Sequence, residues 1–233
     1  MSRLALFDLD NTLLNGDSEV LWGEFLVAQG VLGADFAARN AEMDRLYHAG
    51  QAAPADFCEF FASTLTGRSA TQWEPLRQAF MAQVIRPRLP TSAFALVAQH
   101  RAQGDQLVLT SATSRFLIEL TAAEFGFDHL IATELRVRPD GCFTGTTEGI
   151  LNMREGKVTR LRSWLADQAI PADDALRQAT FYSDSINDLP LLQVVGQPVA
   201  VDPDPQLAQE ALRRHWPVLR LPRSDIFRPR DIQ

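Results

Sequence analysis

The chain has 233 residues, 46% of them hydrophobic, which is enough to bury a sizeable core and excludes a disordered protein. Its net charge of −7 argues against nucleic acid or an anionic membrane as a partner, because an acidic surface repels a polyanion. Two cysteines, Cys58 and Cys142, are too few for a disulfide framework or a zinc site, and no apolar stretch reaches the ~18 residues of a membrane span.

The first predicted element is a strand over residues 4–7, where four consecutive apolar residues are typical of a parallel strand buried on both faces. Asp8 interrupts this run before a secretory signal can form, so we expect a cytoplasmic location. Asp10 follows two residues later, and in an extended chain the two carboxylates point to the same side. Ligands bind at the carboxyl ends of such strands, and two adjacent carboxylates there favour a divalent cation such as Mg²⁺. The alternative is an acidic surface turn.

Residues 16–89 are predicted to be helical throughout, without a strand. Helices are expected from Asp17 or Ser18 to Gly30, from Ala34 to Ala49, from Pro54 onward and from Ser69 onward, each with apolar side chains at helical spacing. We expect this block to be a separate helical bundle that is joined to the rest of the chain by two linkers, near residues 15–16 and 87–90.

From residue 90 onward, helices and strands alternate, which predicts βαβ units and a parallel sheet. The expected strands cover residues 106–110, 129–133, 179–183 and 198–201, and the expected helices cover residues 91–104, 113–125, 157–168 and 189–195. The turn Pro139-Asp140-Gly141 predicts a hairpin over residues 136–143. Residues 224–233 lack any period and are expected to form a loose tail.

Further polar residues stand where predicted strands end. Ser111 and Ala112 follow the strand 106–110, where a hydroxyl and free N–H groups at a helix start can bind phosphate oxygens. Ser111 is equally interpretable as a helix cap. Asp184 ends the strand 179–183, and Asp188 precedes Leu189-Pro190, where it either supports a site or caps a short helix.

Lys157 is expected at the start of a helix, where the helix dipole disfavours a cation by ~0.3–1 kcal/mol. A lysine in this unfavourable position is a candidate for pairing with an anion. The alternative is an ordinary exposed lysine, which is common.

Four motifs therefore stand in order along the chain: Asp8-Leu9-Asp10-Asn11-Thr12-Leu13, Ser111, Lys157 and Asp184-Ser185-Ile186-Asn187-Asp188-Leu189-Pro190. They resemble the four motifs of the haloacid dehalogenase superfamily, and a helical block between the first two resembles the cap of its phosphoserine-phosphatase-like branch. The resemblance implies a three-layer, Rossmann-like α/β core with a mainly parallel sheet in residues 1–15 and 90–223. It also implies an inserted helical cap in residues 16–89.

The same resemblance implies roles for the motif residues. Asp8 is the expected nucleophile that takes up a phosphoryl group, and Asp10 is the expected general acid and base. The phosphate-binding set is Ser111, Ala112 and Lys157, the magnesium-binding set is Asp8, Asp10 (through its carbonyl) and Asp184, and the supporting residues are Asp188 and Asn187. The second aspartate of the first motif favours phosphate over halide as the transferred group, so the chain is expected to be a Mg²⁺-dependent phosphomonoesterase.

The expected partner is a small phosphate monoester, with no nucleic acid and no membrane; the sequence does not give the oligomeric state. Asp17 falls where phosphoserine phosphatases carry an acidic residue that binds the substrate ammonium, although it is equally suited to cap a helix. Departures from those enzymes at Asn11, at Ala112-Thr113 and at Ser183 and Ser185 resemble a sister group that includes histidinol-phosphate phosphatases. The resemblance therefore implies an amine-bearing substrate of the histidinol phosphate or phosphoserine class. Candidate residues in the helical block are Arg39 and Arg45 for a carboxylate, and Trp22, Phe25, Tyr47 and His48 for an imidazole, although most of these four are expected to pack between the block and the core.

Three other functions remain open at this point. The first is phosphotransfer to a small alcohol at the same site. The second is a non-catalytic phosphate-binding regulator, which loss of Asp10 or Lys157 would indicate, and both are present. The third is a nucleic-acid end phosphatase, which the negative charge opposes.

Overall fold

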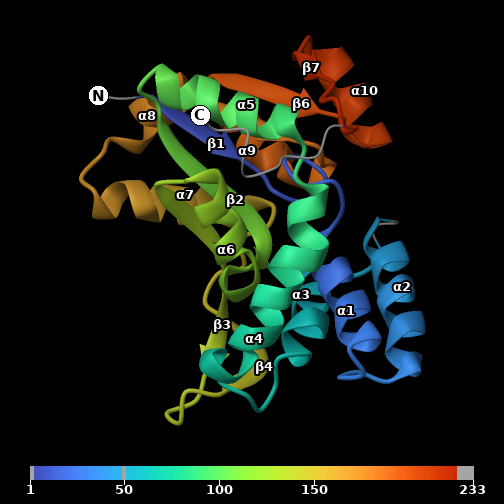
Figure 1. Ribbon diagram of the computed structural model, residues 1–233. Helices are drawn as coiled ribbons and strands as arrows, with labels where there is room; N and C mark the ends of the chain where they lie inside the picture. Colours follow the sequence, from blue (N-terminus) through green and yellow to red (C-terminus); the bar gives the residue numbers. More distant parts are fainter. Residues whose placement is uncertain (1–2, 49–50, 225–233) are drawn as a thin grey trace.

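The protein was analysed as a computed structural model, which describes residues 3–48 and 51–224 (Figure 1). Within these residues the centre is a seven-stranded sheet in the order β4-β3-β2-β1-β5-β6-β7. Its strands are β1 (Leu4–Phe7), β2 (Gln106–Ser114), β3 (His129–Val137), β4 (Phe143–Glu148), β5 (Thr180–Ser183), β6 (Gln197–Val201) and β7 (Val218–Leu219). Neighbouring strands are parallel except for β4, which pairs antiparallel with β3. The predicted α/β class and mainly parallel sheet are confirmed.

Side-chain alternation along β1 divides the core into two apolar clusters. Ala5 and Phe7 pack on one side with α5 (Thr91–Ala102) and α6 (Arg115–Phe125). Leu4 and Leu6 pack on the other side with the remaining core helices, which are α7 (Glu155–Asp167), α8 (Ala172–Gln178), α9 (Leu189–Val194) and α10 (Pro205–Arg214). Burial on both faces explains why this strand is a continuous apolar run in the sequence.

The prediction for the end of β2 was wrong. The strand continues to Ser114 and α6 begins at Arg115, four residues and two residues later than expected. The pairing between β2 and β3 shifts register between Ser111 and Ser114, which keeps this polar segment in the sheet as a bulge. Three elements were not expected from the sequence: α8, α10 and β7.

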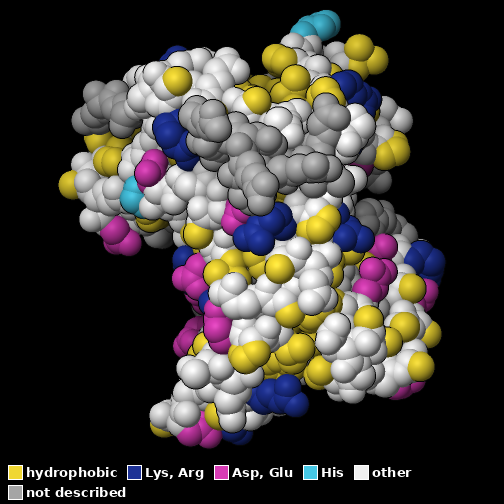
Figure 2. Space-filling view, in the orientation of Figure 1, with side chains coloured by type: hydrophobic (Ala, Val, Ile, Leu, Met, Phe, Trp, Pro, Cys, Tyr) yellow, Lys and Arg dark blue, Asp and Glu magenta, His cyan; other side chains and the backbone are white. Residues whose placement is uncertain are grey.

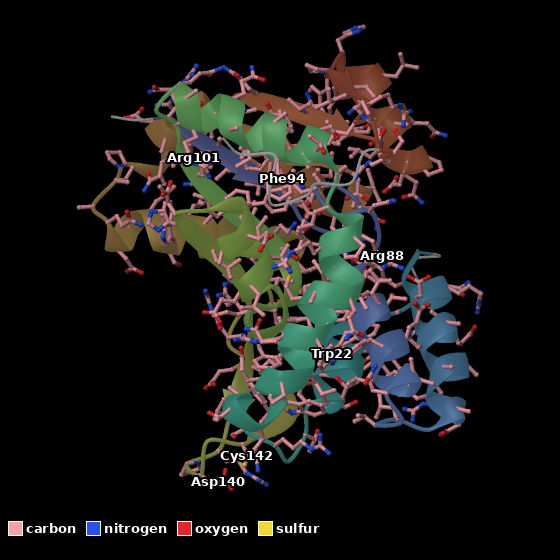
Figure 3. All side chains as sticks on the ribbon, in the orientation of Figure 1. Trp22, Arg88, Phe94, Arg101, Asp140 and Cys142 are labelled. Carbon is pink, nitrogen blue, oxygen red and sulfur yellow. The ribbon has the colours of Figure 1, made fainter. Side chains whose placement is uncertain are left out.

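The helical block comprises α1 (Ser18–Ala28), α2 (Ala34–His48), α3 (Pro54–Ser63) and α4 (Ala70–Phe80). The helix α4 continues through a π-helical segment, η1 (Met81–Ile85), and a 3₁₀ turn, η2 (Arg86–Arg88). In Figure 3, Trp22 lies between α1 and α4, where its ring centroid is 5.9 Å from that of Trp73 and 5.1 Å from that of Phe80. These aromatic side chains belong to the same apolar cluster as Phe7 of β1, so packing is continuous between the block and the sheet.

Two sets of main-chain hydrogen bonds join the helical block to the core. Where the chain enters and leaves the block, Asn15 N donates to Arg88 O at 3.0 Å, so the two connections run side by side. At the far end, Gly67 N donates to Phe143 O and Phe143 N donates to Arg68 O, both at 3.0 Å, which attaches the block to the start of β4. Figure 1 shows the resulting arrangement, with α3 and α4 beside the β3–β4 hairpin.

Within residues 3–48 and 51–224, no helix combines the length and the apolar character needed to cross a bilayer. On the face shown in Figure 2, basic and acidic side chains are interspersed and do not gather into one basic area. The predicted tail lies outside the described residues except for Ser224.

Candidate active site

A cavity of about 410 Å³ lies at the carboxyl ends of the central strands. The residues predicted from the four motifs, together with Asp17, line it: Asp8, Asp10, Asp17, Ser111, Ala112, Lys157, Asp184, Asn187 and Asp188. They come from the segments that follow β1 and β5, from the bulged end of β2 and from the first turn of α7. This is the edge at which open α/β sheets bind ligands.

Lys157 is buried between two carboxylates. Its Nζ lies 2.7 Å from Asp8 Oδ1 and 2.7 Å from Asp188 Oδ2, and its side chain is only 2% exposed. Burial alone lowers the pKa of Lys157, but the negative charges of Asp188 and Asp8 outweigh it and raise the pKa above its usual value. The interpretation of Lys157 as an exposed lysine was therefore wrong, since it is a buried ammonium paired with anions.

Burial also dominates the titration of Asp8. It raises the pKa of Asp8 to about 7 against the opposing effect of Lys157, and the charges of Asp188 and Asp10 raise it further. Asp188 is fixed by a second donor, Ser183 Oγ, at 2.7 Å. One lysine is therefore shared by two carboxylates, and the group as a whole keeps a surplus negative charge.

Asp184 lies on the other side of Asp8. The hydroxyl of Thr12 is 2.9 Å from Asp184 Oδ1 and 3.3 Å from Asp8 Oδ2, so both carboxylates are within reach of one oxygen atom. Burial, and then the charge of Asp8, raise the pKa of Asp184 well above its usual value. No Lys or Arg in the described part of the chain pairs with Asp184. Because Asp8 shares its lysine with Asp188, one ammonium does not balance the two crowded carboxylates, and they are a donor set suited to a hard divalent ion.

The structure does not bring a third acidic side chain to that pair. In the described residues, no group of three or more His, Cys, Asp or Glu side chains converges as a metal site. The carboxylate of Asp10 instead accepts hydrogen bonds from Ser18 N at 2.7 Å, from Thr113 Oγ1 at 2.8 Å and from Ser111 Oγ at 3.3 Å. Mg²⁺ is usually bound by one or two carboxylates with waters, so Asp8, Asp184 and a main-chain oxygen of Asp10 fit it.

Ser111 does not cap a helix. Its Oγ donates to Asp10 Oδ2 and accepts from Thr113 N at 3.1 Å, whereas the residue that precedes α6 is Ser114. The hydroxyl and the neighbouring Ala112 both line the cavity. With the capping interpretation excluded, phosphate binding remains the prediction for this pair.

Asp17 caps a helix and also lines the cavity, so its position agrees with both interpretations of this residue. Its Oδ1 accepts from Glu19 N at 2.9 Å and from Val20 N at 3.0 Å, which caps α1, and the side chain also lines the cavity. Burial, and then the charge of Asp10, raise the pKa of Asp17 to about 8. A cationic ligand group in the cavity would stabilise its ionised form.

The other candidates of the helical block differ in position. Trp22 and Phe25 lie in the apolar core, which agrees with the packing role expected for most of the aromatic candidates. Arg39 and Arg45 do not line the cavity. Tyr47 does line the cavity. The side chain of His48 lies outside the described part of the structure.

Further residues line the cavity that no sequence motif had indicated. Phe57 stacks on Tyr47 with ring centroids 4.1 Å apart, and the two rings form one wall. Arg154 lies opposite the helical block; its Nε donates to Asn187 Oδ1 at 3.1 Å, and Asn187 Nδ2 donates to Tyr47 OH at 3.0 Å. Arg154 has a positive φ of 52°, a backbone strain that no sequence signal announces. Thr12, whose hydroxyl lies near both Asp8 and Asp184, stands inside the first motif, so its place in the site could have been predicted from the sequence.

Comparison with known proteins agrees with the family that the sequence motifs resemble. A sequence model of the haloacid dehalogenase-like hydrolase family matches residues 5–193. The chain is 38% identical over 220 residues to the histidinol-phosphatase of Neisseria meningitidis serogroup C (strain 8013), covering 94% of this chain and 99% of that protein. A solved structure of a protein of unknown function from Bordetella pertussis Tohama I is 40% identical, with TM-score 0.88, and covers 97% of this chain and 100% of that one. A substrate-bound phosphoserine phosphatase shares the fold at 17% identity and TM-score 0.69, over 97% of this chain and 95% of that one.

The family match and the named phosphatases define the class of this protein as a phosphoric monoester hydrolase. The chain belongs to the haloacid dehalogenase-like hydrolase family, and the matched region extends from β1 into α9.

Proposed function

We propose that this protein hydrolyses histidinol phosphate with the help of Mg²⁺ and through an aspartyl phosphate on Asp8. The observation that carries the chemistry is the buried pair of Asp8 and Lys157 beside the unpaired Asp184, on the wall of a cavity. The similarity to a histidinol-phosphatase over nearly the full length of both chains supports the substrate.

The proposed reaction has two steps. The dianionic phosphate repels a carboxylate nucleophile, so the ammonium of Lys157 must offset that charge as Asp8 attacks phosphorus. Asp10 gives a proton to the leaving alkoxide, and afterwards removes a proton from the water that attacks the aspartyl phosphate. When bound by Asp8, Asp184 and the Asp10 carbonyl, Mg²⁺ supplies further positive charge against the phosphoryl group. Ser111 and Ala112 bind the phosphoryl oxygens in this proposal, and Asp188 keeps Lys157 in place.

The cavity wall fits the rest of the substrate. Asp17 offers a carboxylate to the amine, and the stacked rings of Tyr47 and Phe57 offer an apolar surface to the imidazole. Phosphoserine is the second candidate substrate, because Arg154 brings a cation to the same cavity, where it can pair with a carboxylate.

The helical block, residues 16–89, acts in this proposal as a cap on a core formed by residues 1–15 and 90–223. The hydrogen bonds from Tyr47 of α2 through Asn187 to Arg154 cross from one part to the other at the cavity. A cap that closes over the cavity would exclude water while the aspartyl phosphate forms. The cytoplasmic location and the absence of macromolecular partners remain predictions.

The substitution Asp17→Asn tests the amine contact. The amide oxygen keeps the cap on α1, because it can still accept from Glu19 N and Val20 N. Loss of the charge should reduce kcat/KM for histidinol phosphate by the equivalent of roughly 1–3 kcal/mol. Phosphate release should be measured for histidinol phosphate, phosphoserine and a plain aryl phosphate, with wild type and variant side by side.

The aryl phosphate is the internal control, and its kcat/KM should stay unchanged. An equal loss on all three substrates would mean that Asp17 only supports α1. If phosphoserine were the substrate turned over most efficiently by the wild type, the second candidate would replace the first. Consumption of substrate without free phosphate, in the presence of a small alcohol, would indicate phosphotransfer.

Activity should depend on Mg²⁺. Removing divalent ions with EDTA should abolish phosphate release, and adding Mg²⁺ back should restore it, because Asp8 shares its one lysine with Asp188 and Asp184 has no Lys or Arg partner among the described residues. Ca²⁺ should substitute poorly, since its looser coordination does not hold the nucleophile in line.

The variant Asp184→Asn should need a higher Mg²⁺ concentration for half-maximal rate. Full activity after exhaustive dialysis against EDTA would rule out the metal requirement.

A further inference from the structure

Asn152 lies in the segment between β4 and α7, and its side chain is completely buried. Its Nδ2 lies 2.9 Å from Ser111 O on β2 and 2.8 Å from Ile131 O on β3, and it also lies 3.0 Å from Thr110 Oγ1. The main-chain N–H of Asn152 donates to Thr133 Oγ1 at 3.2 Å. One amide therefore joins two neighbouring strands to a segment that belongs to neither.

The contact occurs where the sheet pairing is interrupted. The register between β2 and β3 shifts between Ser111 and Ser114, and a bulge of this kind disrupts the ladder that would otherwise fix the main chain. Asn152 replaces that ladder with a side-chain amide at Ser111 O. The same segment reaches the first turn of α7 within five residues, so it also leads directly to Lys157.

The arrangement leaves one polar atom without a partner. Asn152 Oδ1 is buried and accepts no hydrogen bond from the described residues, a situation that destabilises a protein. An apolar residue would remove this unsatisfied oxygen but would also take the amide donor away from Ser111 O and Ile131 O. The amide therefore holds the main chain at Ser111 at the cost of one unsatisfied atom.

We propose that Asn152 is a positioning residue for phosphoryl transfer, which sets the main chain at Ser111 so that its hydroxyl and the Ala112 N–H face the phosphoryl group. This inference rests on the proposed function, because it requires that Ser111 binds phosphate. Asn152 does not line the cavity and acts through Ser111.

A double-mutant cycle tests the inference. Wild type, Asn152→Ala, Ser111→Ala and the double variant should be compared for kcat/KM on an aryl phosphate and for inhibition by inorganic phosphate. Because a small displacement of a binding group can cost on the order of 10²-fold, Asn152→Ala should lower kcat/KM and weaken phosphate inhibition by up to that amount. In the Ser111→Ala background the same change should have a clearly smaller effect, because only the Ala112 N–H is then left to be displaced.

Asn40 provides a matched control. It is also buried, its Nδ2 donates to a main-chain carbonyl, Val20 O, at 3.0 Å, and its Oδ1 is likewise without a partner among the described residues. Asn40→Ala should lower the melting temperature as Asn152→Ala does, while phosphate inhibition stays unchanged. If Asn152→Ala does not fold, Thr110→Val removes one acceptor of the amide and should give the same non-additive pattern at smaller size.

The outcomes separate the inference from the proposed function. Additive effects of Asn152→Ala and Ser111→Ala, or unchanged phosphate inhibition in a folded Asn152→Ala, would overturn the positioning role. If Ser111→Ala itself left both kcat/KM and phosphate inhibition unchanged, the phosphate site assumed in the proposed function would be wrong, and the inference would be overturned with it.

Discussion

Asp8→Asn should leave no measurable phosphate release, a loss on the order of 10⁴–10⁶-fold in kcat. An amide cannot form the acyl phosphate. Among the described residues, the only other carboxylate beside Lys157 Nζ belongs to Asp188, which supports the lysine from the other side in this proposal. The variant should remain folded, because its amide oxygen can still accept from Lys157. The measurement is phosphate release together with the melting temperature.

Asp10→Asn is the matched variant for this prediction. Its amide oxygen can still accept from Ser18 N, and its amide NH₂ can donate to Thr113 Oγ1 in place of the acceptor there. The amide can no longer transfer a proton, so kcat should fall by roughly 10²–10⁴-fold. With an aryl phosphate, whose leaving group needs no proton, phosphorylated protein should accumulate and be visible by mass spectrometry after a rapid quench. Asp8→Asn should show none. Near-normal turnover of Asp8→Asn would contradict the covalent mechanism.

Lys157→Met should reduce the free energy of unfolding by about 3–5 kcal/mol and also abolish turnover. The substitution leaves Asp8 and Asp188 buried as two like charges, since each lies 2.7 Å from the ammonium that is removed. Chemical denaturation at several pH values measures the effect. The loss of unfolding free energy should shrink as the pH falls. The pKa of Asp8 is raised, so the folded state binds the proton more tightly than the unfolded state. Protonation of Asp8 removes one of the two buried charges.

The double variant Lys157→Met/Asp188→Asn separates stability from catalysis. Removing one of the two carboxylates should recover much of the lost unfolding free energy, while turnover stays absent because the charge that offsets the phosphate is still missing. A Lys157→Met protein as stable as wild type would show that the buried ion pairs contribute nothing to the fold.

The sequence predicted the elements of the sheet better than their ends. The apolar run Leu4–Phe7 is buried on both faces, so its composition indicates a central strand directly. The polar segment Thr110–Ser114 looks like a turn, and only its pairing with β3 and the amide of Asn152 keep it in the sheet. Contacts of that kind involve residues far apart in the chain, and no local pattern encodes them.

The candidate site was also only partly predictable from the sequence. Strand ends located Asp8, Asp10 and Asp184, because the topology of a parallel sheet brings such positions together. The cavity wall was less accessible to prediction, since Tyr47, Trp22 and Phe25 all lie on helices with apolar spacing. Which aromatic residue faces a ligand depends on how α1 and α2 pack against the core, and helical periodicity carries no information on that choice.

The hydrogen bond from Asn15 N to Arg88 O has a consequence for the history and engineering of this chain. Because the entry and exit of the helical block meet, the proposal that the block is an insertion makes the remaining connection from β1 to α5 a short one. Insertions whose ends are adjacent can change in length or content without altering the sheet. Exchange of residues 16–89 for the block of a relative should therefore transfer substrate preference, provided that the new block keeps the contact of Arg77 with Phe116 of α6.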